Sequence, residues 1–86
     1  MSYELSTDNM MQELYRDFKN AEMKLCMARI LTGASGSQRT YFIERIGELR
    51  NEIPLADFEA NVKEVGRLNW LYIDDFIVNQ EKLLRR

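Results

Sequence analysis

The feature that most constrains the fold of this chain is the placement of charge in its last thirty residues. When residues 57–86 are stepped at about 100° each, all eleven charged side chains fall within one half of a helical wheel. A β-hairpin is the competing interpretation, because Trp70-Leu71-Tyr72-Ile73 and Phe76-Ile77-Val78 are strand-like runs separated by Asp74-Asp75. The charge arc favours the helix. We therefore predict one helix over residues 57–85, with no turn at Gly66.

This predicted helix carries more apolar surface than one neighbour covers. Its apolar face spans about 200°, roughly twice what a surface helix needs. The central stripe comprises Phe58, Val62, Val65, Tyr72, Phe76 and Leu83, with Asn69 among them. Because an 86-residue chain offers only two other helices to cover so broad a face, we expect a partner to cover part of it. The predicted partner-binding residues are Trp70, Leu71, Ile73, Ile77, Val78 and Leu84.

Two further helices are predicted upstream. The first runs over residues 8–31, from a cap at Ser6 or Thr7 to a stop at Thr32-Gly33. Its apolar stripe, which we expect in the core, consists of Met11, Leu14, Phe18, Ala21, Leu25 and Ala28. The second runs over residues 38–52 and ends before Pro54. The predicted fold is an all-α three-helix arrangement, a single domain over residues 1–86, assembled as a helical homodimer.

Three polar residues stand on faces that should be apolar. Glu22 and Arg29 lie seven residues apart within the apolar arc of the first helix. They either mark the edge of the core, with their stems packed and their charges in water, or belong to an inter-helix polar pair. Asn69 lies on the central stripe of the third predicted helix, where a buried amide can fix helix register. An amide bonded to water at the edge of a bundle is the alternative.

The composition leaves little material for catalysis or metal binding. Histidine is absent and Cys26 is the sole cysteine, so an intrachain disulfide and Cys/His zinc spacing are both excluded. No nucleophile and base stand together in the sequence. We predict that the chain is not an enzyme and uses no cofactor or metal.

The run Leu71-Tyr72-Ile73-Asp74-Asp75-Phe76 resembles the metal-binding aspartate turn of reverse-transcriptase palm domains. That turn lies on a β-hairpin of a much larger domain, and a distant aspartate completes its metal site. The helical period here predicts instead two aspartates on a solvated helix face.

These observations predict a small non-catalytic interaction protein, an adaptor, inhibitor or regulator that acts through helix–helix association with itself, with a larger protein, or with both. A dimeric nucleic-acid-binding regulator is the alternative, in which Arg39 and Arg45 join Lys19 or Lys24 on one basic surface. The net charge of −2 gives no overall attraction to nucleic acid or anionic lipid. Without a recognisable signal segment or a long apolar run, no membrane association and a cytoplasmic location are expected.

Overall fold

The computed structural model describes residues 2–85, with side chains described from residue 10 onward, and every regular element in this range is helical. The elements are α1 (Ser2–Leu31), α2 (Gly36–Glu52), α3 (Leu55–Gly66), the short 3-10 helix η1 (Trp70–Tyr72) and α4 (Ile73–Leu84). The all-α prediction is confirmed. The prediction of three helices is wrong, because the third predicted helix is divided into α3 and α4.

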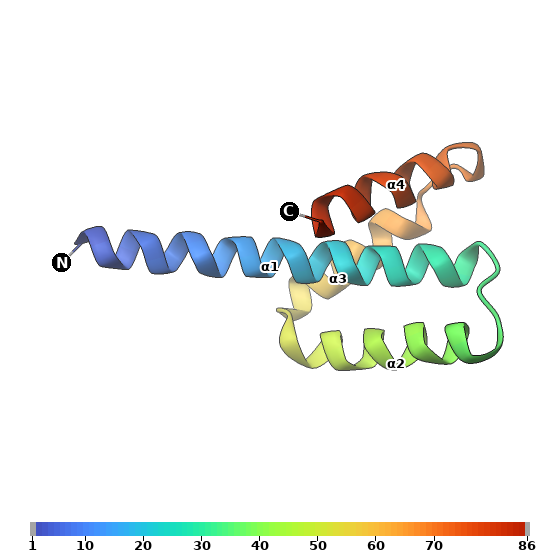
Figure 1. Cartoon of the computed structure of the whole chain (residues 1–86), viewed down its shortest axis with the longest axis horizontal. Helices are drawn as coiled ribbons and strands as arrows, with labels where there is room; N and C mark the ends of the chain where they lie inside the picture. Colours follow the sequence, from blue (N-terminus) through green and yellow to red (C-terminus); the bar gives the residue numbers. More distant parts are fainter. Residues whose placement is uncertain (1, 86) are drawn as a thin grey trace.

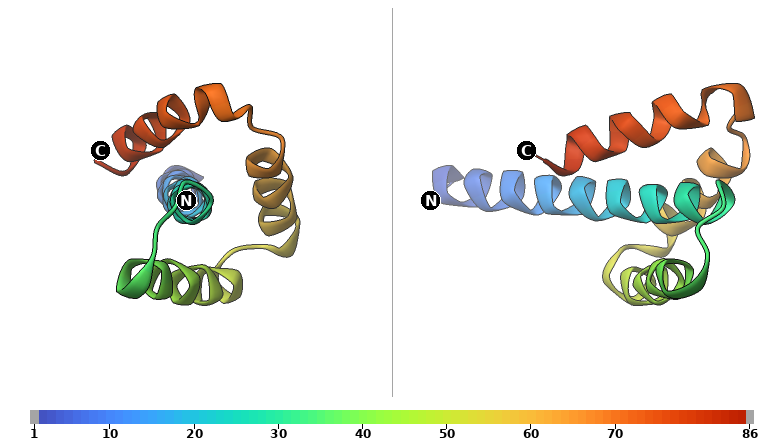
Figure 2. Two further views of the ribbon diagram at one scale, coloured as in Figure 1. Left: turned by 90° about the vertical axis from the view of Figure 1, so that its right-hand side faces the viewer. Right: turned by 45° about the vertical axis from the view of Figure 1, so that its right-hand side comes forward.

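Helix α1 is the centre of the molecule. Viewed along its axis, α2, α3 and α4 are arranged around three sides of it, and each packs against it (Figure 2). The helices differ greatly in length: at 1.5 Å per residue, the 30 residues of α1 span about 45 Å, and the 12 residues of α4 only about 18 Å. The N-terminal half of α1 therefore projects well beyond the other helices (Figure 1).

Two apolar clusters hold the peripheral helices to α1. Met23 of α1 packs with Leu49 and Ile53 of the α2 end, and the half-buried Met27 and Phe58 complete this cluster. On another side of α1, Ala28 packs with Ile73 and Ile77 of α4, supported by the half-buried Leu25, Leu68 and Phe76. Small residues at Ala21 and Ala28, both buried, let neighbouring helices approach α1 closely.

The chain breaks the third predicted helix between Gly66 and Trp70. Helix α3 ends as the amide of Arg67 donates to the carbonyls of Lys63 and Glu64. The side chain of Asn69 then accepts a hydrogen bond from the amide of Leu71 at 3.0 Å, which caps η1. Asn69 is thus an exposed helix cap, and its predicted role as a buried register residue is wrong.

The break also explains why the predicted helix looked so broadly apolar. The buried residues of α3 are Asn61 and Val65, and those of α4 are Ile73, Ile77 and Gln80. On one continuous helix these two sets would point about 100° apart. In the structure each set faces α1 from its own segment. The predicted 200° face therefore combines the buried face of α3 with the buried face of α4, each of which is of normal width.

The cap at Asn69 can be tested by substitution. Asn69→Ala should lower the free energy of unfolding by about 1 kcal/mol, because the amide of Leu71 loses its acceptor. Asn69→Asp keeps a side-chain acceptor and should retain most of the stability. Urea denaturation followed by circular dichroism measures both. Equal losses in the two variants would contradict the capping role.

Candidate interaction surface

The projecting half of α1 is an amphipathic helix without cover on its apolar side. Residues 10–18 are all exposed, whereas buried positions begin at Ala21. Within this stretch the large apolar side chains gather in an arc of about 140°, opposite Gln12, Glu13 and Arg16, with Asp17 at the edge of the arc. They are Met10, Met11, Leu14, Tyr15 and Phe18, which we call the α1 stripe. The expectation that Met11, Leu14 and Phe18 are core residues is wrong, because the peripheral helices do not reach that far.

The C-terminal turn of α4 turns part of the α1 stripe into a groove. One wall of the groove comes from α1 and consists of Met11, Leu14, Tyr15, Asp17 and Phe18. The other wall comes from the end of α4 and consists of Leu83, Leu84 and Arg85. The groove encloses about 680 Å³. Leu83 is itself well exposed, so apolar side chains of both helices are open to water at the same place. This combination of a concave shape and an apolar lining suits an inserted helix.

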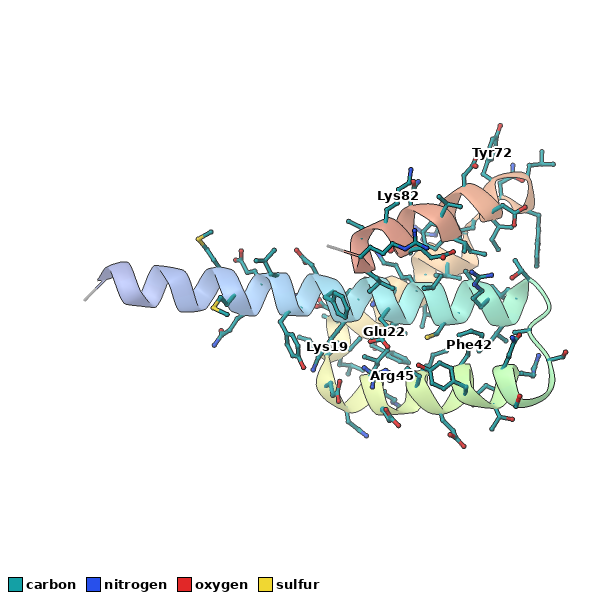
Figure 3. The ribbon with its side chains drawn as sticks, viewed as in Figure 1. Lys19, Glu22, Phe42, Arg45, Tyr72 and Lys82 are labelled. Carbon is teal, nitrogen blue, oxygen red and sulfur yellow. The ribbon has the colours of Figure 1, made fainter. Side chains whose placement is uncertain are left out.

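The residues predicted to bind a partner lie in three different environments. Ile73 and Ile77 are only 6% and 5% exposed and belong to the core against α1, so they are not available to a partner. Trp70, Leu71 and Val78 are exposed, and Leu71 is the most exposed at 83%. Tyr72, which belongs to η1 with Trp70 and Leu71, is also exposed and extends outward from the molecule (Figure 3). Leu84 is half-buried and lines the groove.

The charges that stand on the apolar arc of α1 each form an ion pair with another helix of the same chain. Arg45 of α2 donates to both carboxylate oxygens of Glu22, at 2.7 and 2.9 Å (Figure 3). These hydrogen bonds, with one to Glu48, raise the pKa of the Arg45 guanidinium, so it stays charged. Arg29 donates to Glu81 of α4 at 2.9 Å. Both residues therefore take part in inter-helix polar pairs, but not with each other.

A polar network that sequence reasoning missed anchors α3 to the point where α1 leaves the core. Buried Asn61 donates to Asn20 at 3.0 Å, Asn20 donates to Asp57 at 3.1 Å, and Arg16 forms a two-pronged ion pair with Asp57. Hydrogen bonds from Arg16 and then Asn20 lower the pKa of Asp57 to about 2. The one sign of this network in the sequence is Asn61, a polar amide that stands among apolar residues on the central stripe of the helix predicted over residues 57–85.

A second buried amide is less well satisfied. Gln80 of α4 is 6% exposed, and its Oε1 atom has no hydrogen-bond partner among the described residues.

Three of the four basic residues expected to form a nucleic-acid surface are paired with acidic side chains. Lys19 pairs with Glu52 at 3.1 Å, Lys24 with Glu64 at 2.9 Å, and Arg45 with Glu22 and Glu48. The outer side of α4 begins with Asp74 and Asp75, which are exposed. Among the side chains that the structure describes, residues 10–85, no group of three acidic, cysteine or histidine residues is placed to hold a metal ion.

None of the described helices combines the length and the apolar character needed to cross a bilayer. Comparison with known proteins finds no match for this chain among protein-family models, curated proteins or solved structures.

The lowered pKa of Asp57 predicts a pH-dependent contribution to stability. Because its folded pKa is about 2 against an ordinary value of 3.8, the ionised carboxylate stabilises the fold above about pH 4. This contribution is lost as the pH falls toward 2. Asp57→Asn should therefore be less stable than the unmodified chain at about pH 5, and the difference should shrink on acidification to about pH 2.

Thermal unfolding over that pH range measures the effect. Asp75→Asn, at an exposed position on α4, is the matched control and should show no comparable pH-dependent difference. A stability gap between Asp57→Asn and the unmodified chain that is the same at both pH values would contradict the assignment.

Proposed function

We propose that this chain is a small non-catalytic interaction protein that works by helix–helix association and assembles as a homodimer through the α1 stripe. The observation that carries the proposal is the row of five large apolar side chains on a projecting helix. Exposed apolar patches of this kind typically mark protein–protein contact sites. The heptad-like spacing of Met11, Leu14 and Phe18 is the spacing by which two helices pack in a coiled coil.

The amount of exposed surface suits a dimer. The α1 stripe and Leu83 are 41–67% exposed. Together these six residues leave on the order of 700 Å² per chain in water, close to the roughly 800 Å² that each partner buries in a standard interface. A second copy carries an identical stripe, so each stripe can cover the other in a two-fold symmetric contact.

The non-catalytic part of the proposal rests on the available chemistry. The sequence has no histidine, and burial raises the pKa of the Cys26 thiol to about 11, with a smaller contribution from Glu22. A thiol with so high a pKa is a poor nucleophile near neutral pH. Nucleic-acid binding has less support, because Lys19, Lys24 and Arg45 are engaged with carboxylates.

The proposal predicts that a charge in the α1 stripe abolishes association without unfolding the chain. Leu14→Asp should raise the dissociation constant of the dimer by roughly 100-fold or more. A two-fold contact loses two leucines, each worth about 1.5–3 kcal/mol of burial. Helical content should not fall, because Leu14 is exposed in the isolated chain. Light scattering and analytical ultracentrifugation over a wide concentration range measure the mass.

Two control variants make this experiment decisive. Ile43→Asp introduces the same charge at an exposed apolar site of α2 and should leave the dimer intact. Trp70→Ser tests the exposed tip at η1, the other candidate surface. If Trp70→Ser separates the copies and Leu14→Asp does not, the α1 stripe is not the contact. A chain that stays monomeric at all concentrations contradicts the homodimer, and a foreign partner would then have to cover the stripe.

A further inference from the structure

The exposed α1 stripe and the site of α4 lie on one continuous face of α1. Leu25, which packs against the cluster formed with α4, lies seven residues after Phe18, which is nearly two helical turns. Helix α4 runs antiparallel to α1 and ends above its middle (Figures 1 and 2). The stripe is therefore open toward the N-terminal end of α1 and blocked by α4 toward its C-terminal end.

The position of α4 limits how a second copy can cover the α1 stripe. The proposed contact joins two identical stripes, so its two-fold axis passes close to the middle of the stripe, at Leu14. A partner α1 aligned with α1 about this point continues beyond Phe18 in either direction, because the helix is 30 residues long. It would then enter the space in which α4 packs against Leu25 and Ala28. Both parallel and antiparallel alignment are therefore blocked.

We infer that the two copies of α1 cross at a steep angle at the α1 stripe, each passing beside the end of the other copy's α4. This inference rests on the proposed homodimer and specifies its geometry. In a crossed contact the partner's α1 leaves the stripe sideways, so α4 keeps its place. The C-terminal turn of α4, whose Leu83 and Leu84 line the groove, then lies beside the crossing helix. The partner copy thereby completes the groove.

The shape of the α1 stripe suits a crossing helix. Its side chains spread over an arc of about 140°, whereas the seam of a two-stranded coiled coil is narrower. From Met10 to Phe18 the stripe is about 12 Å long, which matches the diameter of about 10–12 Å of one helix with its side chains. The spacing of Met11, Leu14 and Phe18 also forms the rows of side chains that pack into the grooves of a crossing helix.

The end of α4 supports the crossed contact independently of the stripe. Leu83 is 41% exposed, although it lies in the wall of the groove that faces α1. A helix aligned with α1 would collide with this turn of α4. A helix that crosses in front of the turn covers Leu83 together with Leu14 and Phe18. One crossed contact therefore buries the exposed apolar side chains of both helices.

A distance between the C-terminal ends of the two α1 helices distinguishes the arrangements. Leu31 is exposed and lies 17 residues after Leu14, about 26 Å along the helix. A spin label on Leu31→Cys should therefore be about 30–40 Å from its copy in a steeply crossed dimer. The same distance would be about 50 Å or more in an antiparallel dimer and below about 20 Å in a parallel one.

Double electron–electron resonance measures this distance, and circular dichroism verifies that the labelled chain is folded. The native Cys26 is buried, so the unmodified chain should take up no label. Glu13→Cys, on the side of α1 opposite the stripe and close to the crossing point, is the matched control, because its distance should hardly depend on the crossing angle.

The Leu14→Asp substitution connects the distance to the proposed contact. Added to the labelled Leu31→Cys chain, it should abolish the distance between copies. If it does so, but the distance before its addition is that of an aligned pair, the crossed geometry is wrong and the proposed homodimer stands. If the chain does not dimerise, or if the distance survives Leu14→Asp, both the homodimer through the α1 stripe and its geometry are wrong.

Discussion

Everything in this fold depends on α1 serving as the shared packing partner of the other helices. Over residues 19–31 it is surrounded on three sides, and each peripheral helix is also joined to it by an ion pair: Glu22 to Arg45 of α2, Lys24 to Glu64 of α3 and Arg29 to Glu81 of α4. Such pairs add little stability individually when partly exposed. Their larger effect is to fix which side of α1 each helix occupies, while Met23 and Ala28 supply the burial.

Local sequence signals predicted the boundaries around α2 well, and the division of α3 from α4 poorly. Gly33 follows α1 with a φ of 109°, and Pro54 precedes α3, so glycine and proline marked real ends. Gly66 likewise ends α3, but the charge pattern argued against a turn there. The last residue of α3 and the first of α4 are seven positions apart, nearly two full turns, so the charge pattern continues in phase across it. Asn69 is a further cue, because a short amide side chain favours a helix cap, but its position on the apolar stripe also suits a buried amide or one bonded to water.

The candidate surface was only partly predictable for a related reason. Periodicity indicates which face of a helix is apolar, but it does not indicate how much of its length other helices cover. The stripe from Met11 to Ala28 is one pattern in the sequence, and its two ends have opposite environments because α4 spans less than half of α1. Part of the excess apolar surface expected on the C-terminal helix is buried at Ile73 and Ile77, while Trp70, Leu71 and Val78 remain exposed. The periodicity of α1 did not indicate that its N-terminal half would be uncovered.

The single continuous face on α1 also links folding to assembly. The four-residue connection between α1 and α2 makes their contact local, whereas α4 must return across 52 residues for Glu81 to reach Arg29. Any opening that detaches α4 uncovers Leu25 and Ala28 and extends the exposed stripe along nearly the whole helix. Intramolecular docking of α4 therefore competes with intermolecular contact for the same side chains, and exchange of α4 between two copies would preserve every contact that it makes.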